Sequence, residues 1–210
     1  MKTILDKLNW RYATKKFDNS KKVSSKNLNT LLEGGRLTAS SYGLQPYHIF
    51  VIENADVRKE LRKVSYDQPQ ITDASHLIVL ANKPTFDHAM IDDYIENIMA
   101  VRGLDKDDLK DFSETMKSTL LDLPDAQKNT WTSNQAYIVL GNLMTIAAEM
   151  EIDACPMEGF ENAKYNEILG LTEKGLNAAV VLAVGYRSAE DETQNHTKVR
   201  YSQEQIVTHI

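Results

Sequence analysis

The most apolar part of the chain is the uncharged stretch from Asn129 to Ala148. From Ala136 onward its apolar residues fall on nearly every side of a helical wheel, and such a helix is buried in a core, a subunit interface or a membrane. Polar residues interrupt the run too often for a membrane span, which needs about 20 predominantly apolar residues. We therefore expect a buried helix at the centre of a domain or between two copies of the chain, with Asp125 as its N-cap.

Four shorter apolar runs predict strands over Tyr47–Glu53, His76–Ala81, Ile152–Met157 and Ala178–Tyr186. The first two are apolar at most positions, which indicates burial on both faces of a sheet. Strands that alternate with helices predict an α/β or α+β layered fold, which we take as one domain over residues 1–210. We expect the helices at residues 2–10, from Ser24 or Ser25 to between Gly34 and Thr38, at 55–64, as a pair between 86 and 122 broken near Gly103, and at 162–169.

Composition and charge narrow the function classes. The chain has 210 residues and a net charge of −6, which argues against a general binder of nucleic acids or anionic membranes. The single cysteine, Cys155, excludes an intramolecular disulfide and a cysteine-rich metal site. The first ten residues have Asp6 and Lys7 where a signal peptide needs its apolar core, so we expect a cytoplasmic protein.

Several kinds of site are missing from the sequence. It has no glycine-rich dinucleotide or P-loop cradle and no G-x-S-x-G nucleophile elbow. Its histidines are scattered without metal-ligand spacing, and His76, at a strand start, is expected to be a hydrogen-bonded structural residue. Cys155 precedes Pro156 in an apolar setting, which is more typical of a small core residue than of a nucleophile.

Basic residues at the two ends of the chain remain as candidates for binding. Arg11 and Lys15 lie near the start, and Lys198 and Arg200 near the finish. Together they would form a phosphate pocket, because arginine binds phosphate through two hydrogen bonds and lysine as a point charge. Periodicity does not show that they meet, and residues 11–18 also fit a solvated connector. The loop 39–46, small and polar, would allow backbone to approach a ligand closely, although an ordinary loop explains it equally well.

Six segments, in order and spacing, together resemble the FMN-dependent nitroreductase family, and most closely the oxygen-insensitive NAD(P)H nitroreductases and flavin reductases of bacteria. Each segment alone is a weak signal, but the six span residues 11 to 200. They are Arg11-Tyr-Ala-Thr-Lys15, Ala39-Ser-Ser-Tyr-Gly-Leu-Gln-Pro46, Asp67-Gln-Pro-Gln70, Asp73-Ala-Ser-His76, Pro156-Met-Glu-Gly-Phe160 and Lys198-Val-Arg200.

The resemblance implies a three-layer α/β/α sandwich of α+β class, with a mixed, mainly antiparallel sheet and the long helix at an intertwined homodimer interface. It implies FMN as cofactor, NADH or NADPH as reductant, and no nucleic-acid or membrane partner. Arg11, Lys198 and Arg200 would bind the FMN phosphate, and Lys15 would stabilise the reduced flavin at its N1/O2 edge. The remaining flavin contacts would be Tyr12, Ala13, Ser40, Ser41, Gly43, Gln45, Asp67, Gln70, Pro156, Met157, Glu158 and Gly159.

These contacts differ in kind. Residues 40–45 match a loop that reaches the flavin from the partner subunit. A backbone N–H of Glu158 or Gly159 would point at flavin N5, and Gly159, which has no Cβ, permits that approach. No side chain need act as nucleophile or obligatory acid. Tyr42 and Tyr66 fall at substrate-facing positions, where stacking and plain packing are equally compatible with an aromatic residue.

Two positions depart from close relatives, which often have asparagine at Asp67 and a second lysine at Gln70. The Asp67 carboxylate could accept a hydrogen bond from the flavin N3–H but, unlike asparagine, could not donate one. Gln70 removes a positive charge near N1/O2, so we expect a lower flavin midpoint potential than in relatives with the second lysine.

The resemblance implies ping-pong transfer of hydride from NAD(P)H through flavin N5 to nitroaromatic, quinone or flavin-type acceptors. An alternative on the same scaffold is dihydropteridine or enone reduction. An alternative of another class is a flavin carrier or sensor with little turnover, which would need the phosphate contacts but not Lys15 or the Glu158–Gly159 pair. The physiological acceptor and the preference between NADH and NADPH do not follow from the sequence.

Overall fold

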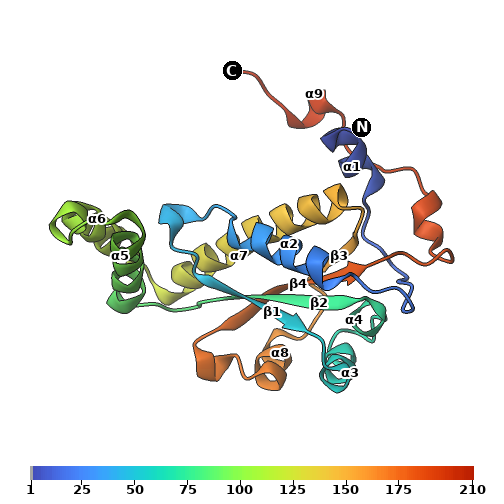
Figure 1. The fold of residues 1–210 in the computed structure, drawn as a ribbon, viewed down its shortest axis with the longest axis horizontal. Coiled ribbons are helices and arrows are strands. Elements are labelled where there is room, and N and C mark those ends of the chain that lie inside the picture. Colours follow the sequence, from blue (N-terminus) through green and yellow to red (C-terminus); the bar gives the residue numbers. More distant parts are fainter. Residues whose placement is uncertain (1) are drawn as a thin grey trace.

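A four-stranded sheet forms the centre of the chain, of which the computed structural model describes residues 2–210 (Figure 1). The strands are β1 (Tyr47–Ile52), β2 (His76–Asn82), β3 (Asp153–Met157) and β4 (Asn177–Gly185). Their order is β1-β2-β4-β3, and each neighbouring pair is antiparallel. Every residue of β2 is buried, as its apolar run predicted.

β1 departs from the prediction of burial on both faces. Of its six residues only Ile52 is buried, and His48 is exposed. β1 is an edge strand that pairs with β2, and one of its sides has no neighbouring strand in the described part of the chain. An apolar run of this length does not distinguish an edge strand from a central one.

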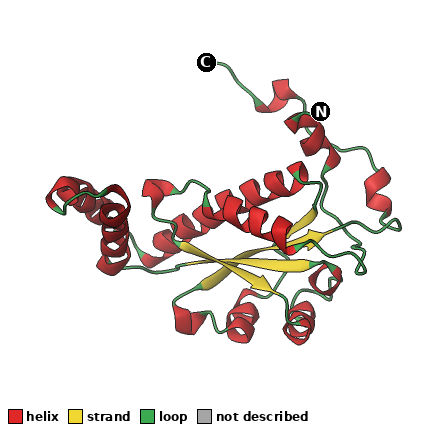
Figure 2. Cartoon of the chain, viewed as in Figure 1, coloured by secondary structure: helices red, strands yellow, loops and turns green. Residues whose placement is uncertain are grey.

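Helices cover both faces of the sheet, as Figure 2 shows by colour. On one face lie α2 (Ser25–Arg36) and α7 (Asp125–Glu149), and on the other α3 (Ala55–Lys63), α4 (Gln70–Asp73) and α8 (Asn162–Leu169) (Figure 1). The predicted three-layer α+β arrangement is therefore correct. Within residues 2–210, parallel pairing is limited to an isolated bridge between Ala13 and Ala154 of β3.

Alternate residues of β2 serve the two cores, because successive side chains of a strand point to opposite faces. Ile78 and Leu80 belong to the core on the α7 side, together with Leu143. Leu77 and Val79 belong to the core on the side of α3 and α8. Each layer of helices is thus held by its own set of buried side chains.

The long helix α7 has 25 residues and begins slightly earlier than predicted. Pro124 is its N-cap and accepts from the N–H groups of Gln127 and Lys128, so Asp125 is the first helical residue and not the cap. Its buried face packs on the sheet, but Tyr137 and Ile138 on the other side are 37% and 48% exposed. The prediction of burial on every side is therefore not met within a single chain.

A helical pair extends from one end of the sheet (Figure 1). It consists of α5 (His88–Arg102), a 3₁₀ turn at Asp107–Leu109 and α6 (Lys110–Leu120), with a small core of its own. Gly103 ends α5 in the left-handed conformation, φ 66°, at the predicted break.

Helix α1 (Ile4–Trp10) and the C-terminal tail lie on the α7 side of the sheet, above α7 in the view of Figure 1. Helix α1 starts with a capping box between Thr3 and Asp6 and packs against α7. The tail after β4 contains 3₁₀ residues Glu192–Asn195 and the short helix α9 (Gln203–Ile206). Among the described residues, no helix combines the length and apolar character that crossing a membrane requires.

Candidate functional site

The segment 11–18 and the tail after β4 are joined through the carboxylate of Asp191. Its Oδ2 accepts from the Tyr12 hydroxyl at 2.9 Å and from the backbone N–H groups of Lys15 and Lys16 at 2.8 and 3.1 Å. Asp191 is 1% exposed. Burial alone would raise the pKa of Asp191, but these donors hold it below its ordinary value. Asp191 therefore fixes the backbone that carries Lys15.

Arg187 connects the segment 10–12 to strand β3. It binds Asp153, the first residue of β3, through its backbone N–H at 2.8 Å and its Nε at 2.7 Å. Its guanidinium lies 4.3 Å from the ring centre of Trp10 and 4.5 Å from that of Tyr12, so two aromatic faces enclose it. The aromatic residues of the 10–12 segment are thereby anchored to the sheet.

Three of the four basic residues predicted at the two chain ends meet, whereas Lys15 does not line the cavity that they share. Arg11, Lys198 and Arg200 line one cavity of about 510 Å³, whose wall includes the apolar side chains of Met144 and Pro156. The Lys198 ammonium donates to the carbonyl oxygens of Leu8, at 2.5 Å, and of Arg11. Three cations thus share one concave site, as an anion-binding pocket requires.

The electrostatics of this cavity favour an anion. Burial, and then repulsion by Arg200, lowers the pKa of Arg11. Burial, and then repulsion by Arg11 and Arg200, lowers the pKa of Lys198. The Nε of Arg11 is buried and has no hydrogen-bond partner in residues 2–210. A phosphate group would relieve the repulsion and satisfy this donor.

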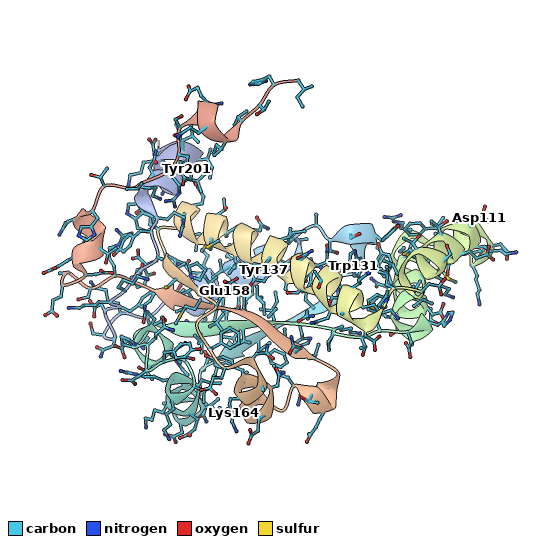
Figure 3. All side chains as sticks on the ribbon, turned by 180° about the vertical axis from the view of Figure 1, so that it is seen from behind. Asp111, Trp131, Tyr137, Glu158, Lys164 and Tyr201 are labelled. Atoms are coloured by element: carbon cyan, nitrogen blue, oxygen red, sulfur yellow. The ribbon has the colours of Figure 1, made fainter. Side chains whose placement is uncertain are left out.

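The last residues of β3 and the segment that follows them lie beside the cavity. Pro156 lines the cavity, while Met157 is buried in the core on the α3 side. The hydroxyl of Tyr137, on α7, donates to the Glu158 carboxylate, and Figure 3 shows the two side chains together. Burial, the hydrogen bond and the charge of Glu158 raise the pKa of Tyr137 to about 12. The hydroxyl therefore stays protonated and acts as a donor at neutral pH.

Gly159 is closely approached by the loop before α4. A Cβ at this position would lie 3.0 Å from Nε2 of Gln68 and 3.6 Å from the ring of Tyr66. Tyr66 and Asp67 both have positive φ, 52° and 53°, although neither is glycine. Such backbone costs about 1–3 kcal/mol per residue, and residues that adopt it cluster at functional sites.

Asp67 and Gln70, the two departures, have different surroundings. The carboxylate of Asp67 accepts from Nε of Arg62 at 2.7 Å and is largely exposed. Gln70 is buried, and its Oε1 accepts no hydrogen bond from the described part of the chain. Gln70 lies near Cys155, whose thiol pKa is raised by burial against the opposing effects of Lys15 and Gln70. Cys155 itself is a core residue, as predicted.

Residues 40–45 do not line the cavity. The Ser41 N–H donates to Gln135 of α7 at 2.8 Å, and Gln45 Nε2 donates to the Arg36 carbonyl at 2.7 Å. Gly43 has φ 80°, and a Cβ there would lie 2.2 Å from the hydroxyl of Tyr94 on α5. The loop therefore packs against α2, α5 and α7 and does not reach the cavity formed by Arg11, Lys198 and Arg200 of the same chain.

The two predicted substrate residues, Tyr42 and Tyr66, lie on different loops. Tyr42, with φ 56°, lies 6.3 Å from the ring centre of Phe112 on α6. In contrast, Tyr66 is 73% exposed on the other loop. Within one chain the two predicted substrate residues therefore belong to different regions.

Sequence reasoning did not single out Asp191, Gln68 or Met144. Asp191 and Gln68 act through hydrogen bonds to distant backbone groups, and Met144 through the turn of α7 that faces the cavity. No local pattern marks such residues. His76, by contrast, is hydrogen-bonded as expected, to Ser75 at 3.0 Å, with Glu53 3.3 Å from its Nε2.

Comparisons with known proteins agree on the type of protein. Residues 8–186 match the model of the Nitroreductase family. A protein of Staphylococcus epidermidis named "Putative NAD(P)H nitroreductase" is 36% identical over 99% of this chain and 97% of its own length. One of Bacillus subtilis with the same description is 35% identical over 93% of this chain and 94% of its own length.

Solved structures show the same fold. A nitroreductase from Exiguobacterium sibiricum, solved in complex with FMN, superposes with a TM-score of 0.83 at 19% identity, covering 100% of this chain and 98% of that one. An enone reductase of gut-bacterial fatty acid metabolism superposes with a TM-score of 0.84 at 17% identity, covering 100% and 99%. At these identities the likeness concerns the fold alone.

Proposed function

Because the chain belongs to the nitroreductase family, we propose that it is an FMN-dependent oxidoreductase that uses NADH or NADPH as reductant. The observation that carries this proposal is the cavity in which Arg11, Lys198 and Arg200 converge and in which Arg11 Nε has no partner in the described chain. The names of the relatives and the FMN complex of a protein with the same fold support the choice of cofactor.

The residues present fit an FMN molecule. Arg11, Lys198 and Arg200 would bind the phosphate, and Tyr12, Ala13 and Pro156 would line the path beside it. When bound, the flavin supplies the hydride acceptor and donor for the reaction. Lys15 would stabilise the negative charge of its reduced form, with the neutral Gln70 at the second position.

The protein's own contribution is positioning. Asp191 holds the backbone of Lys15, and Tyr137 holds the Glu158 side chain. Met157 contributes from the core behind the segment, and the N–H groups of Glu158 or Gly159 would face the flavin ring. We infer that no side chain acts as nucleophile, and that reductant and acceptor use the same open face in turn.

We propose a homodimer with α7 at its interface. Tyr137 and Ile138 of α7, and Ile4 and Leu5 of α1, are exposed apolar residues of a single chain. Residues Ser40, Ser41, Gly43 and Gln45 are far from the cations of their own chain and would reach the partner's flavin. Tyr42 would come with this loop, and Tyr66 from the other subunit, to contact the substrate.

The proposed acceptors are nitroaromatics, quinones or free flavin, and we place the reaction in the cytoplasm, which supplies reduced nicotinamides. An enone reductase with the same fold makes an enone a further candidate acceptor. The exposed face of Tyr66, 73% accessible, would suit a flat conjugated molecule of either kind.

The purified protein tests the proposal directly. We expect a yellow protein whose flavin absorbance bleaches on anaerobic addition of NADH or NADPH and returns when an acceptor is added. Flavin that binds without bleaching would indicate a carrier. A colourless protein that takes up no FMN would contradict both. Steady-state rates with each nicotinamide against nitroaromatic, quinone, flavin and enone acceptors would then identify the acceptor class.

A further inference from the structure

The loop that precedes α4 is held in an unusual shape by Arg62. Tyr66 and Asp67 are consecutive non-glycine residues with φ 52° and 53°. The Nε of Arg62 donates to the Asp67 carboxylate at 2.7 Å, and the Arg62 carbonyl accepts from the Asp67 N–H at 3.2 Å. Strained backbone persists only when its surroundings fix it, so this loop is built to deliver the next residue, Gln68, to a defined place.

That place is the backbone after β3. The Gln68 Nε2 donates to the Gly159 carbonyl at 2.8 Å and to the Ser65 carbonyl, in its own loop, at 3.0 Å. A second link runs alongside, from the Glu161 N–H to the Val64 carbonyl at 2.8 Å. One side-chain amide thus connects the strained loop with the glycine beside the candidate site.

The peptide groups on both sides of the Gly159 Cα are consequently fixed. The carbonyl of Gly159 is held by Gln68, and the carbonyl of Glu158 accepts from the Phe160 N–H at 2.9 Å. In a trans peptide the N–H points opposite to the carbonyl, so the Gly159 N–H points away from the Phe160 turn. Within residues 2–210 this N–H donates to no group.

We propose that Gln68 is a positioning residue for the reaction. It holds the Gly159–Phe160 peptide by its carbonyl, the N–H of that peptide binds the Glu158 carbonyl, and the free Gly159 N–H is thereby a fixed hydrogen-bond donor to the flavin. The inference rests on the proposed function. A fixed donor costs no reorganisation during the reaction, whereas a mobile one must be ordered in each turnover. Gln68 does not line the cavity that contains Arg11, Lys198 and Arg200. Replacing Gln68 should therefore slow the reaction and leave flavin binding largely intact.

The first measurement uses the protein without FMN. Gln68→Met keeps the length of the side chain and removes its donor, and Gln127→Met makes the same change at an exposed position of α7. Amide hydrogen exchange resolved by NMR should show Phe160 and Glu161 exchanging on the order of tenfold faster in Gln68→Met than in wild type or Gln127→Met. Gln68→Lys, which restores a donor on a flexible chain, should give an intermediate rate. Equal rates in all four proteins would overturn the inference.

The second measurement uses the FMN-loaded protein. For Gln68→Met we expect flavin reduction by NADH or NADPH to slow by about tenfold, with the Kd for FMN changed less than about threefold. The flavin absorption spectrum should also shift, because a hydrogen bond to the ring is altered. Faster exchange without a change in reduction rate or spectrum would show that Gln68 holds the segment but does not serve the reaction.

The two proposals fail in different ways. Wild-type protein that binds no FMN would contradict the proposed function, and with it the role of Gln68 toward a flavin. Wild-type protein that binds and reduces FMN, together with a Gln68→Met variant of equal exchange or equal rate, would contradict the role of Gln68 alone. Gln68→Lys keeps the test available if the Met variant does not fold.

Discussion

The side-chain ammonium of Lys198 donates a hydrogen bond to the carbonyl oxygen of Arg11, across 187 positions of sequence. The same nitrogen donates to the Leu8 carbonyl at 2.5 Å, so Lys198 ties the tail to the end of α1. This contact places two cations, Lys198 and Arg11, beside each other and beside Arg200, and burial together with repulsion lowers the pKa of both Lys198 and Arg11. The fold therefore contains a positive site that an anion stabilises.

Replacing Lys198 by methionine tests this site. The change removes one of three cations and two hydrogen bonds to backbone, so we expect FMN affinity to fall by roughly 10- to 100-fold, the equivalent of a charged hydrogen bond of about 1.5–3 kcal/mol. Titration of the FMN-free protein with FMN, monitored by flavin fluorescence, measures the affinity. Lys174→Met is the control, because Lys174 also donates to a carbonyl, that of Gly170, but is exposed and outside the cavity. Equal losses in both variants would contradict the assignment.

Replacing Gln70 by lysine tests the tuning of the flavin. Gln70 is buried, and its Oε1 accepts no hydrogen bond from any residue between 2 and 210. A lysine there would add a positive charge near the candidate N1/O2 position and stabilise the reduced flavin, so the midpoint potential should rise. Potentiometry of the FMN-loaded variant measures the shift, with Gln127→Lys as a control of equal charge on the surface. Without an upward shift specific to Gln70→Lys, the placement of Gln70 beside the flavin is wrong.

Much of the fold could be predicted because the pattern of apolar residues indicates which segments form strands and helices. The runs at 76–82 and 177–185 are strands because their apolar residues are buried on both faces, and 162–169 is a helix closed by Gly170 in the left-handed conformation. The errors have a common cause. β1 and α7 are as apolar as buried elements but are exposed on one side of a single chain, and composition does not tell which side a neighbouring strand or subunit covers.

The candidate site was predictable only in part. Arg11, Lys198 and Arg200 were selected by residue type and by the resemblance, and the structure brings them together. The residues that hold them in place were not predictable. Asp191 binds N–H groups 175 and 176 positions away, and such contacts leave no local pattern. Long-range hydrogen bonding to backbone is set by the tertiary fold and not by sequence spacing.

Replacing Asp191 by asparagine tests this support. The Asp191 carboxylate accepts hydrogen bonds from two backbone N–H groups and from the Tyr12 hydroxyl. In Asp191→Asn these three donors would bind a neutral amide oxygen, which is a weaker acceptor than a carboxylate. We therefore expect the free energy of unfolding to fall by about 1–3 kcal/mol and FMN binding to weaken. Denaturant unfolding and FMN titration measure the two effects. Asp122→Asn, at an exposed position, is the control.

The pH dependence of stability offers a second test of Asp191. Its folded-state pKa is depressed, so its contribution is present above the unfolded value near 3.9 and is lost as the pH falls through the folded value. The stability difference between wild type and Asp191→Asn should therefore be full at neutral pH and shrink in strong acid. A difference that stays constant as the pH falls below the unfolded value and on into strong acid would mean that the charge of Asp191 is not what stabilises the segment.

The outward face of α7 decides whether the dimer is needed for flavin binding. Leu140 of α7 is unsuitable for this test, because it is 5% exposed and belongs to the chain's own core, so a buried carboxylate there would unfold the protein. Ile138 is 48% exposed, and Ile138→Asp should leave the folded chain within about 0.5 kcal/mol of wild type. If α7 forms the interface, this variant should be monomeric by light scattering and should lose FMN. The comparable change Val101→Asp, at an exposed position of α5, should leave a flavin-bound dimer. A folded Ile138→Asp monomer that keeps FMN would show that the flavin site is complete within one chain.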